Sequence, residues 1–503
     1  MTLSNVLSRA QCGVDAPLVR VETHISNGLP AFSIVGLPAT AVRESKDRVR
    51  SAIINSHFEW QEKRLTVNLS PADLPKDGGR FDLPIALGIL VASGQVPEPA
   101  LAGMEFIGEL SLSGALRPIA GTVGAAIAAS RAQRSLVVPA LSAASAVLVP
   151  DAKILPVTRL LELTAHLNGT QPIQPATTQD HHFATNYADL ADVRGQPVAK
   201  RALEIAAAGG HNLLFCGPPG TGKTMLASRL PGILPPLLQS ELLQLMTIRS
   251  ALDPLLSPEN CWQRPFRAPH HSASAKALVG GGSDPRPGEI SLAHCGVLFL
   301  DELPEFPRAV LDVLREPMES GNITLSRVYR QVSYPARFQL VAAMNPCPCG
   351  FDGDPQHTCR CTPDQIQRYR QRLSGPLLDR IDLLLNLPRI PTSLLTRRAA
   401  SEEGSAPVRA RVAAARARQL DRAGVINSQL NQRQLEADCA LAGADQKLLE
   451  QATDELGLSM RAYHRILKVS RSIADLAANP QIDRSHLIEA MGYRQLNLEQ
   501  IGL

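Results

Sequence analysis

The segment 211–230, "HNLLFCGPPGTGKTMLASRL", decides which fold the chain adopts. It contains a short apolar run, a turn rich in glycine and proline, and a stretch that favours a helix. Residues 217–224 fit the pattern G-x4-G-K-[ST], in which backbone N–H groups face phosphate oxygens and a helix N-terminus adds its dipole. An ordinary glycine turn is the alternative, but it requires neither the strand before the loop nor the helix after it. We therefore expect a P-loop α/β domain that binds a nucleotide.

The pattern also predicts what individual side chains of this loop do. Lys223 can reach the β- and γ-phosphates of a nucleoside triphosphate, and the hydroxyl of Thr224 can coordinate Mg²⁺. The residues expected to contact ATP are Gly217, Pro218, Pro219, Gly220, Thr221, Gly222, Lys223 and Thr224.

A second motif, "GVLFLDELPEF" at 296–306, supplies the acidic groups that ATP hydrolysis requires. Four apolar residues, 297–300, predict a buried strand, and Asp301 and Glu302 stand at its end. Asp301 is expected to hold Mg²⁺ and Glu302 to orient and polarise the attacking water. The alternative is an acidic pair that caps a helix.

Two polar segments divide the chain of 503 residues, whose length predicts about three domains. Residues 169–186 and 396–409 contain few large apolar side chains. The part between them alternates apolar strands with Gly/Pro loops, which indicates a parallel α/β sheet, whereas the part after them shows only helical spacing. The predicted units are 1–168, 187–395 and 408–503.

The beginning of the chain and its composition favour a soluble, cytoplasmic protein. The first residues contain no charged head followed by an apolar run, which argues against a secretory signal. The longest weakly polar stretch, 135–150, is short and holds two prolines, so we expect no membrane partner. The net charge of +4 is too small to indicate nucleic-acid binding by itself.

Four of the nine cysteines lie in the stretch "NPCPCGFDGDPQHTCRC" at 345–361. In a reducing compartment, clustered cysteines favour a metal over disulfides. Four thiolates match a closed tetrahedral Zn²⁺ site, although two-residue gaps are commoner than the single gaps found here. We expect a zinc-finger-like insert at 346–362, with His357 as a substitute ligand and free thiols or disulfides as the alternatives. The predicted ligands are Cys347, Cys349, Cys359 and Cys361.

Three longer stretches carry a resemblance to a known family. They are "FRAPHHSASAKALVGGGSDPRPGEISLAHCGVLFLDELPEF" (266–306), "ITLSRVYRQVSYPARFQLVAAMNPCPCG" (323–350) and "LLDRIDL" (377–383). Through them the chain resembles the magnesium-chelatase-like AAA+ ATPases, and closely the ComM/YifB family, almost from end to end. The resemblance implies a homo-oligomeric ring, expected to be hexameric, that moves along single-stranded or branched DNA. It also implies a helicase that drives branch migration in natural transformation and homologous recombination.

The resemblance assigns further catalytic residues. Asn345, at the end of the apolar run "FQLVAAM", matches the polar sensor that positions the attacking water. Arg380 in "LLDRIDL" matches the arginine finger that reaches the neighbouring subunit's nucleotide. An internal pair with Asp379 or Asp382 is the alternative for Arg380. Arg461 in "LSMRAYHRIL" (458–467) matches the second sensor arginine, and Arg465, one turn later, competes for that role.

The inserts contain candidate DNA contacts. The segment 323–338 predicts a hairpin, and in related ring helicases such a hairpin points into the pore. Arg327 and Arg330 near its tip are expected to contact backbone phosphates, unless they are solvated or pair between subunits. His270 and His271 are read as structural or pore-facing rather than as metal ligands. The arginines of 408–422 indicate either a solvated helix or a basic surface.

The first unit resembles the proteolytic domain of Lon, which implies an α+β fold. It contains "PKDG" at 75–78, but Arg80 occupies the position of the Lon serine. No lysine follows "GELSLSGALRPIAG" (108–121) where the Lon lysine would lie. A Ser–Lys mechanism needs both groups, so we expect no peptidase activity. The expected architecture is a Lon-like domain, a central AAA+ domain with inserts, and a C-terminal helical lid.

A chelatase-type motor, which drives metal insertion into a porphyrin through a partner protein, is the main alternative function. The Lon-like domain and the cysteine-rich insert favour the DNA motor, because chelatase ATPase subunits generally have neither. A non-catalytic assembly platform is disfavoured by the complete set Lys223, Asp301, Glu302, Asn345 and Arg380.

Overall fold

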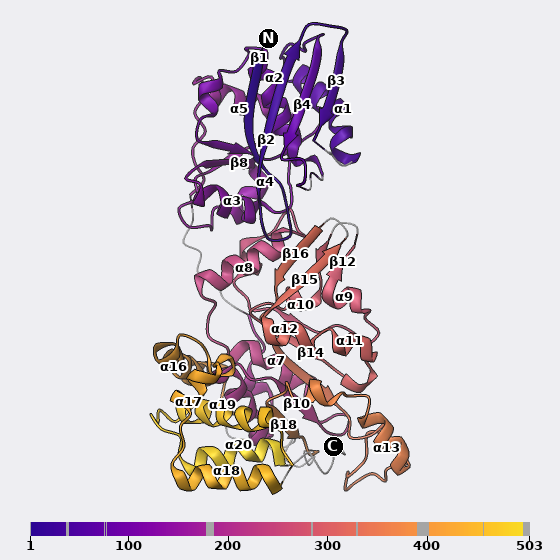
Figure 1. Cartoon of the computed structure of the whole chain (residues 1–503), viewed down its shortest axis with the longest axis vertical. Helices are drawn as coiled ribbons and strands as arrows, with labels where there is room; N and C mark the ends of the chain where they lie inside the picture. The colour runs from indigo at the N-terminus through magenta and orange to yellow at the C-terminus, as the bar shows by residue number, and fades with distance from the viewer. Residues whose placement is uncertain are drawn as a thin grey trace.

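The computed structural model describes residues 2–36, 40–74, 76, 78–177, 186–282, 285–327, 330–389, 402–455 and 457–495. The N-terminal part lies at one end of the long axis of the molecule, and the helical C-terminal part lies toward the other end, beside the strands β10 (Leu213–Cys216) and β18 (Leu383–Asn386) of the central part (Figure 1). Within these ranges, no helix is both long and apolar enough to cross a membrane.

The central part is built on a five-stranded sheet in the order β11-β14-β17-β10-β18. Every neighbouring pair in it is parallel, as the alternation of strands and loops in the sequence predicts. The strands are β10 (Leu213–Cys216), β11 (Phe266–Arg267), β14 (Val297–Leu300), β17 (Gln339–Met344) and β18 (Leu383–Asn386). The carboxyl ends of β14, β17 and β10 therefore lie side by side, where parallel sheets place their ligands.

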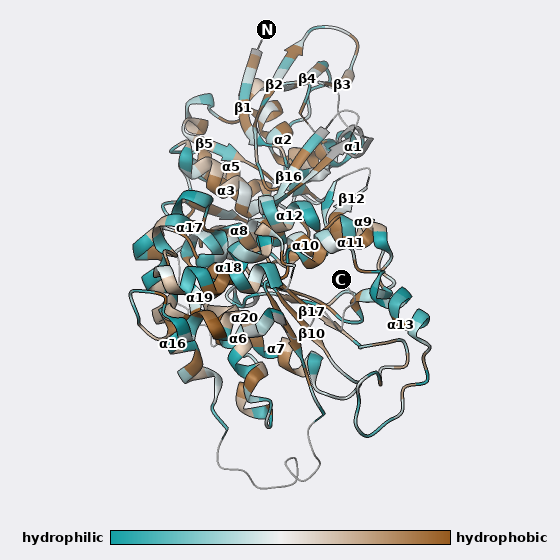
Figure 2. Ribbon diagram, turned by 60° about the horizontal axis from the view of Figure 1, so that its bottom comes forward, coloured by the Kyte–Doolittle hydropathy of each residue, from teal (hydrophilic) through white to brown (hydrophobic). Residues whose placement is uncertain are grey.

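Helices cover both faces of this sheet, which explains why its strands are apolar throughout. Leu213 and Phe215 pack on one face against α6 (Pro197–Gly209) and α7 (Lys223–Ile233). Leu214 points to the opposite face and joins a second cluster. Figure 2 shows β10 and β17 as hydrophobic strands at the centre of the molecule.

Among the described residues, the N-terminal part contains three sheets, the smallest of which is the antiparallel pair of β6 (Glu109–Leu110) and β7 (Leu116–Arg117). The first is mixed and has the order β1-β2-β4-β3, and the second is parallel with the order β5-β8-β9. The strands are β1 (Thr2–Arg9), β2 (Leu18–Ser26), β3 (Ala31–Val35), β4 (Arg64–Ser70), β5 (Met104–Phe106), β8 (Ser135–Pro139) and β9 (Ile154–Val157). The helices are α1 (Thr40–Asn55), α2 (Asp82–Ala92), α3 (Thr122–Arg131), α4 (Ala140–Ala146) and α5 (Leu160–Leu167).

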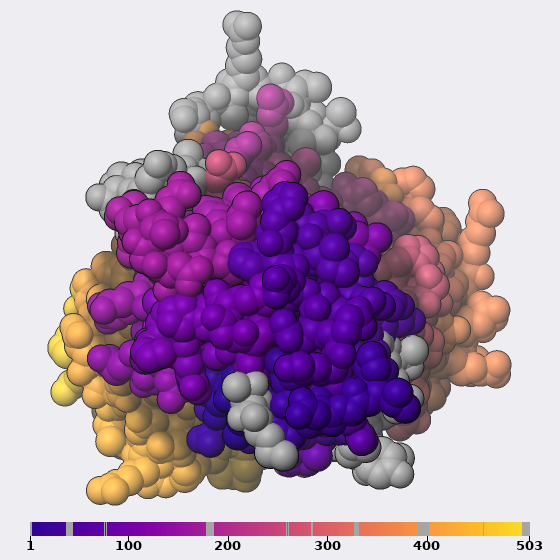
Figure 3. Space-filling model, turned by 90° about the horizontal axis from the view of Figure 1, so that it is seen from above, coloured from indigo at the N-terminus to yellow at the C-terminus, as the bar shows by residue number. Residues whose placement is uncertain are grey.

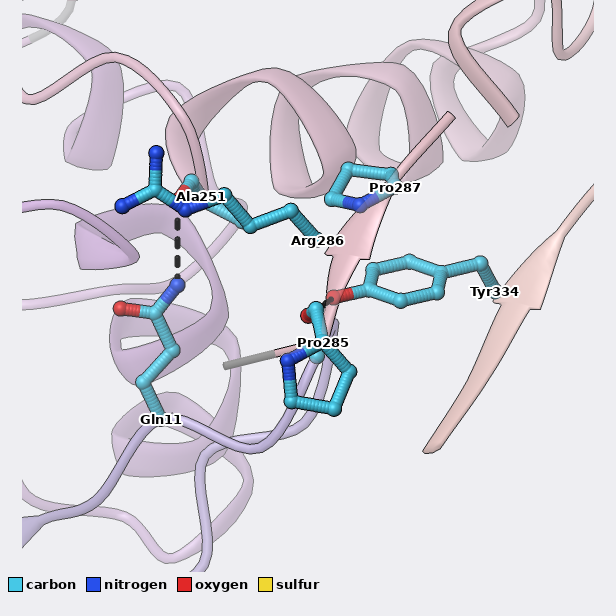
Figure 4. Close-up of a pocket in the computed structure, with 7 residues that line it drawn as sticks. Gln11, Ala251, Pro285, Arg286, Pro287 and Tyr334 are labelled. Carbon is cyan, nitrogen blue, oxygen red and sulfur yellow. Dashed lines mark hydrogen bonds between the residues drawn. The ribbon is translucent and has the colours of Figure 1, made fainter. Parts of the chain in front are cut away.

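Several contacts among the described residues join the N-terminal part to the central part, including a hydrogen bond from Ser142 to the Pro254 carbonyl at 3.1 Å. Helix α3 packs on α8 (Gln239–Ser250), where the backbone N–H of Gly121 donates to the Ser250 carbonyl at 2.6 Å. The loop after β1 reaches the inserts and lines a small pocket with Gln11 beside Ala251, Pro285 and Tyr334 (Figure 4). Seen from above, the N-terminal part covers most of this end of the molecule (Figure 3).

The insert before β17 is an antiparallel hairpin, as predicted, formed by β15 (Asn322–Arg327) and β16 (Arg330–Pro335). Arg327 and Arg330 face each other in its register. Their side chains lie outside the described residues, so the predicted phosphate contacts remain a prediction.

The C-terminal part is helical, also as predicted. Its helices are α16 (Ser405–Ala423), α17 (Gln432–Asp438), α18 (Gly443–Glu455), α19 (Met460–Leu476) and α20 (Arg484–Gln495). Helix α16 begins three residues before the expected boundary at 408. The polar stretch that we interpreted as a linker contains its first turn, because serine and proline are tolerated where a helix starts.

Candidate nucleotide site

The phosphate loop connects β10 to α7, and its conformation depends on glycine. Gly220 and Gly222 have φ angles of 81° and 87°, in the left-handed region that other residues rarely adopt. Helix α7 begins at Lys223 directly after this turn. Its first backbone N–H groups and the positive end of its dipole are thus presented at the loop, an arrangement that favours an anion.

Lys223 lies at the centre of the site. Its Nζ donates to the carbonyl oxygens of Gly217 at 2.6 Å and Pro218 at 3.0 Å, and to Asn345 Oδ1 at 3.1 Å. Burial lowers the pKa of Lys223, while the nearby carboxylate of Asp301 acts in the opposite direction. The ammonium group is held by neutral oxygens, which leaves its positive charge available to a phosphate.

Thr224 and Asp301 are in direct contact, as the two motifs require. The hydroxyl of Thr224 donates to Asp301 Oδ2 at 2.8 Å. Hydroxyl and carboxylate oxygens are hard ligands that suit Mg²⁺. The residues present therefore fit Mg²⁺, which Thr224 and Asp301 would hold.

Glu302 follows Asp301 in an unusual backbone conformation, with φ 51° and ψ 48°. Its N–H donates to Asp301 Oδ1 at 2.9 Å. Strain of this kind persists where the surrounding structure fixes it, and it is common at functional sites. The side chain of Glu302 is half exposed, and its Oε2 lies 3.1 Å from His271 Nδ1.

The contact with His271 is the part of the site that the sequence did not predict. His271 lies thirty-one positions before Glu302 in the chain, within an insert loop, and its ring is tilted against that of His270 with the centroids 4.0 Å apart. No spacing in the sequence connects a loop histidine to a strand-end glutamate. Only the parallel pairing of β11 with β14 brings the two segments to one edge.

Asn345 directly follows β17, the strand between β14 and β10. This position explains its contact with Lys223, because neighbouring parallel strands end at the same edge of the sheet. Asn345 is thereby placed beside the lysine of the phosphate loop, where the resemblance to AAA+ sensors predicts it.

Arg380 is almost entirely buried, with 8% of its surface exposed. It donates to the Pro376 carbonyl at 2.6 Å and forms an ion pair with Glu319. Among the described residues, its carboxylate partner is therefore Glu319 rather than the expected alternatives Asp379 and Asp382. The role of Arg380 as an arginine finger stays a prediction, because it concerns a second copy of the chain.

The two candidate sensor arginines on α19 differ in environment. Arg465 pairs with Asp382 at 2.5 Å, whereas Arg461 is exposed in the first turn of the helix. Burial raises the pKa of Asp382, but Arg465 and His211 outweigh it and hold that pKa well below its usual range. Arg465 thus connects the helical part to the sheet, and Arg461 remains the candidate sensor.

His211 also contacts Ser472, with 2.7 Å between His211 Nε2 and Ser472 Oγ. Together with Asp382 this gives the residue types of a nucleophilic triad. His211 and Ser472 are completely buried, so no substrate can reach the serine. This network joins β18, α19 and the start of β10 and has a structural role.

The four predicted zinc ligands come together. Their sulfur atoms lie within 4.8 Å of one another, with 3.3 Å between Cys347 and Cys349. All nine cysteines lie in the described ranges, and none forms a disulfide. His357 stacks on Phe351 and lies 3.5 Å from Asp354, so it is not part of the cluster.

The arginines of α16, which the sequence left as solvated or as part of a basic surface, make contacts within the chain, although Arg411, Arg418 and Arg422 are exposed. Arg416 is half-buried and donates to the Ala207 carbonyl at 2.9 Å. Arg422 pairs with Asp475 at 2.8 Å, and Arg411 with Glu204 at 2.6 Å. These side chains attach α16 to its neighbours, which explains why they form no stripe on the helix.

Arg80 in the N-terminal part is buried. It donates to the carbonyl oxygens of Ala120 at 2.5 Å and Arg9 at 3.4 Å, and burial lowers its pKa to about 10. This cation is held by backbone carbonyls inside the N-terminal part, and its correspondence to the Lon serine stays a prediction. Residues 75 and 77 of the "PKDG" stretch lie outside the described residues.

Three family models match the chain, and all three describe parts of a magnesium chelatase subunit. Residues 189–395 match the family model described as magnesium chelatase, subunit ChlI. Residues 21–142 match the model for subunit ChlI of Mg-chelatase, and 402–494 match the model for its C-terminal part.

Full-length relatives carry a different name. The chain is 53% identical to competence protein ComM of Haemophilus influenzae, over 99% of this chain and 98% of that protein. It is 52% identical to the uncharacterized protein YifB of Salmonella typhimurium, with the same coverage. By contrast, the magnesium-chelatase 67 kDa subunit of Heliobacterium mobile is 29% identical over 33% of this chain and 29% of its own length.

Proposed function

Because the chain belongs to the magnesium-chelatase-like ComM/YifB family, we propose that it is a Mg²⁺-dependent ATPase whose ring drives branch migration of DNA. The observation that carries this proposal is the meeting of Lys223, Thr224, Asp301 and Asn345 at one edge of the sheet. These groups come from three neighbouring strand ends, and together they provide what phosphoryl transfer to water requires.

Each side chain has a defined task in hydrolysis. Lys223 and the loop N–H groups bind the β- and γ-phosphates, and Thr224 and Asp301 hold Mg²⁺. When bound, Mg²⁺ neutralises negative charge on the phosphates. Glu302 polarises the attacking water, and Asn345 positions that water against the γ-phosphate.

The site is completed by a second copy of the chain. Arg380 acts in the neighbouring subunit's site, where its guanidinium stabilises negative charge in the transition state. Its partner Glu319 has a side chain that is 60% exposed, so a neighbouring subunit has access to this pair. Assembly would exchange an internal ion pair for a contact with nucleotide. Arg461 contributes as the second sensor from the helical part.

The hairpin β15–β16 supports DNA as the substrate. It leads directly into β17, and Asn345 stands at the far end of that strand. A force on the hairpin would pass through residues 336–338 into β17 and along this strand to Asn345. A full-length relative that is named a competence protein also supports DNA as the substrate.

A chelatase-type motor is the second candidate, because the matching family models carry the name of a chelatase subunit. The curated chelatase subunit noted above matches only a third of the chain, which favours the DNA motor.

Measurement of ATP hydrolysis with and without single-stranded and branched DNA separates the two candidates. We expect stimulation by DNA that weakens as salt rises from about 50 to 200 mM, because phosphate contacts release counterions. The Lys223→Ala variant is the control for contaminating ATPases. Hydrolysis without any DNA binding at low salt would favour the chelatase-type motor instead.

A further inference from the structure

The cysteine cluster begins two residues after the sensor Asn345 and rests on the phosphate loop. Cys347 is completely buried, and its carbonyl accepts a hydrogen bond from the Gly350 N–H at 3.0 Å. Gly350 has a φ of 85°, so the chain makes a tight left-handed turn between two of the cysteines and the rest of the insert. This turn is the knuckle, residues 347–350.

The knuckle is in close contact with the residues that bind nucleotide. A methyl group built on Gly350 would lie only 2.7 Å from Pro219 Cδ and 3.9 Å from Asn345 Cγ. The backbone at Gly350 is therefore packed against the phosphate loop, with no room for a side chain. Any movement of the knuckle must displace Pro219 or open a gap beside it.

Packing of apolar side chains cannot hold the insert in place. Between 346 and 362, Cys347 and Gly350 are the only buried residues. A polar insert of this length needs another source of stability, and small domains without a hydrophobic core commonly use a bound metal. One end of the insert is fixed by Arg370, which donates to Asp352 at 2.7 Å and to the Pro346 carbonyl at 3.2 Å.

The sulfur positions fit a tetrahedral ion. A Zn–S bond of about 2.3 Å places the four sulfurs of a tetrahedron roughly 3.8 Å apart. Cys359 Sγ lies 3.7 Å from Cys347 Sγ and 3.5 Å from Cys349 Sγ, and it also accepts the N–H of Cys361 at 3.4 Å. All four ligands are thiolates, so the site is closed and the ion would have no open position for catalysis.

We propose that Cys347, Cys349, Cys359 and Cys361 bind one structural Zn²⁺, and that this ion keeps Gly350 pressed against Pro219. The phosphate loop then has its binding conformation only while the metal is present. The zinc site stands independently, whereas its effect on nucleotide rests on the ATPase function proposed above.

Two variants separate the metal from the contact. The double variant Cys359→Ser/Cys361→Ser removes two ligands, and Gly350→Ala leaves the ligands but forces a methyl group toward Pro219. His357→Ala is the matched control, because His357 lies in the insert but outside the cluster. Zinc content is measured by mass spectrometry of the full-length proteins, and nucleotide affinity is measured with a fluorescent ATP analogue.

We expect about one zinc per chain in the parent, His357→Ala and Gly350→Ala proteins, and none in the double variant. Nucleotide affinity should fall about tenfold in Gly350→Ala, equivalent to about 1.4 kcal/mol, and at least as much in the double variant. A parent protein free of zinc under reducing, zinc-supplemented expression would overturn the metal site. Full nucleotide affinity in Gly350→Ala or in the zinc-free double variant would overturn the coupling.

A measurement on the parent protein removes any dependence on variant folding. Zinc is released with a thiol-blocking mercurial, the mercurial is removed with excess thiol, and the protein is transferred to buffer that contains Mg²⁺. Nucleotide affinity should fall on release and return when ZnCl₂ alone is added back. Affinity that is unaffected by release, or that does not return although zinc is bound again, would contradict the coupling. If the parent binds zinc but no nucleotide, the ATPase proposal fails and the zinc site stands.

Discussion

The substitution Glu302→Gln tests the assignment of the water-polarising group most sharply. Glutamine has the shape of glutamate but cannot accept a proton from water, so ATP should still bind while its hydrolysis stops. Loss of a general base typically lowers turnover by about 10²- to 10⁴-fold, which is roughly 3–5 kcal/mol in the barrier. The structure predicts a much smaller effect on folding. The Glu302 side chain is 50% exposed, and its contact with His271 lies at the surface, where such pairs contribute about 0–1 kcal/mol.

The assay is phosphate release at saturating ATP and Mg²⁺, together with ATP affinity and a thermal melt. Glu305→Gln is the matched control, because Glu305 lies three residues away and pairs with Arg372 at 2.8 Å, outside the nucleotide site. We expect turnover to fall only in Glu302→Gln, with unchanged ATP affinity and a melting temperature within a few degrees of the parent. Parent-level turnover in Glu302→Gln, or an equal loss in Glu305→Gln, would refute the assignment.

Two further predictions concern histidines. His271 contacts one of the two carboxylate oxygens of Glu302 and thereby competes with the attacking water, so His271→Ala should raise basal ATP turnover by up to about fivefold. The control is His270→Ala, and a lower basal rate in His271→Ala would contradict this prediction. Burial, helped by Arg337, lowers the pKa of His294 to about 4 from its ordinary 6.5, so the folded state resists protonation that the unfolded state accepts. The contribution of neutral His294 to the free energy of unfolding should therefore be fully present above pH 6.5. It should decline toward pH 4, by about 3 kcal/mol at most. In thermal melts, the melting temperature of His294→Gln should fall less between pH 6.5 and pH 4 than that of the parent protein. An identical pH dependence in the parent and the variant would exclude His294 as the source of the decline.

The sequence predicted most reliably those features of the structure that depend on residues close together in the chain. The phosphate loop, the strands that end at Asp301 and Asn345, and the hairpin at 322–335 were all predicted, because glycine turns and apolar runs specify them locally. The parallel sheet then brings Lys223, Thr224, Asp301 and Asn345 together without further information.

Features that depend on tertiary packing escaped prediction. The contact of His271 with Glu302 and the packing of Gly350 on Pro219 join segments that are distant in sequence. The contacts of the α16 arginines also escaped prediction, since their spacing does not reveal the carbonyls and carboxylates of α6 and α19 that receive them. The partner of Arg380 was misjudged because Glu319 lies sixty-one positions away in the chain.

Mixing two impaired variants tests directly whether the nucleotide is hydrolysed between two copies of this chain. Arg380→Ala keeps its own base but gives its neighbour no arginine, whereas Glu302→Gln lacks the base but offers Arg380. Each variant alone should show little hydrolysis, and co-assembly of the two is verified with different affinity tags. We predict that the mixed oligomer recovers ATPase activity, because an Arg380→Ala chain beside a Glu302→Gln chain has a complete site. Co-assembly without any recovery would contradict the shared site.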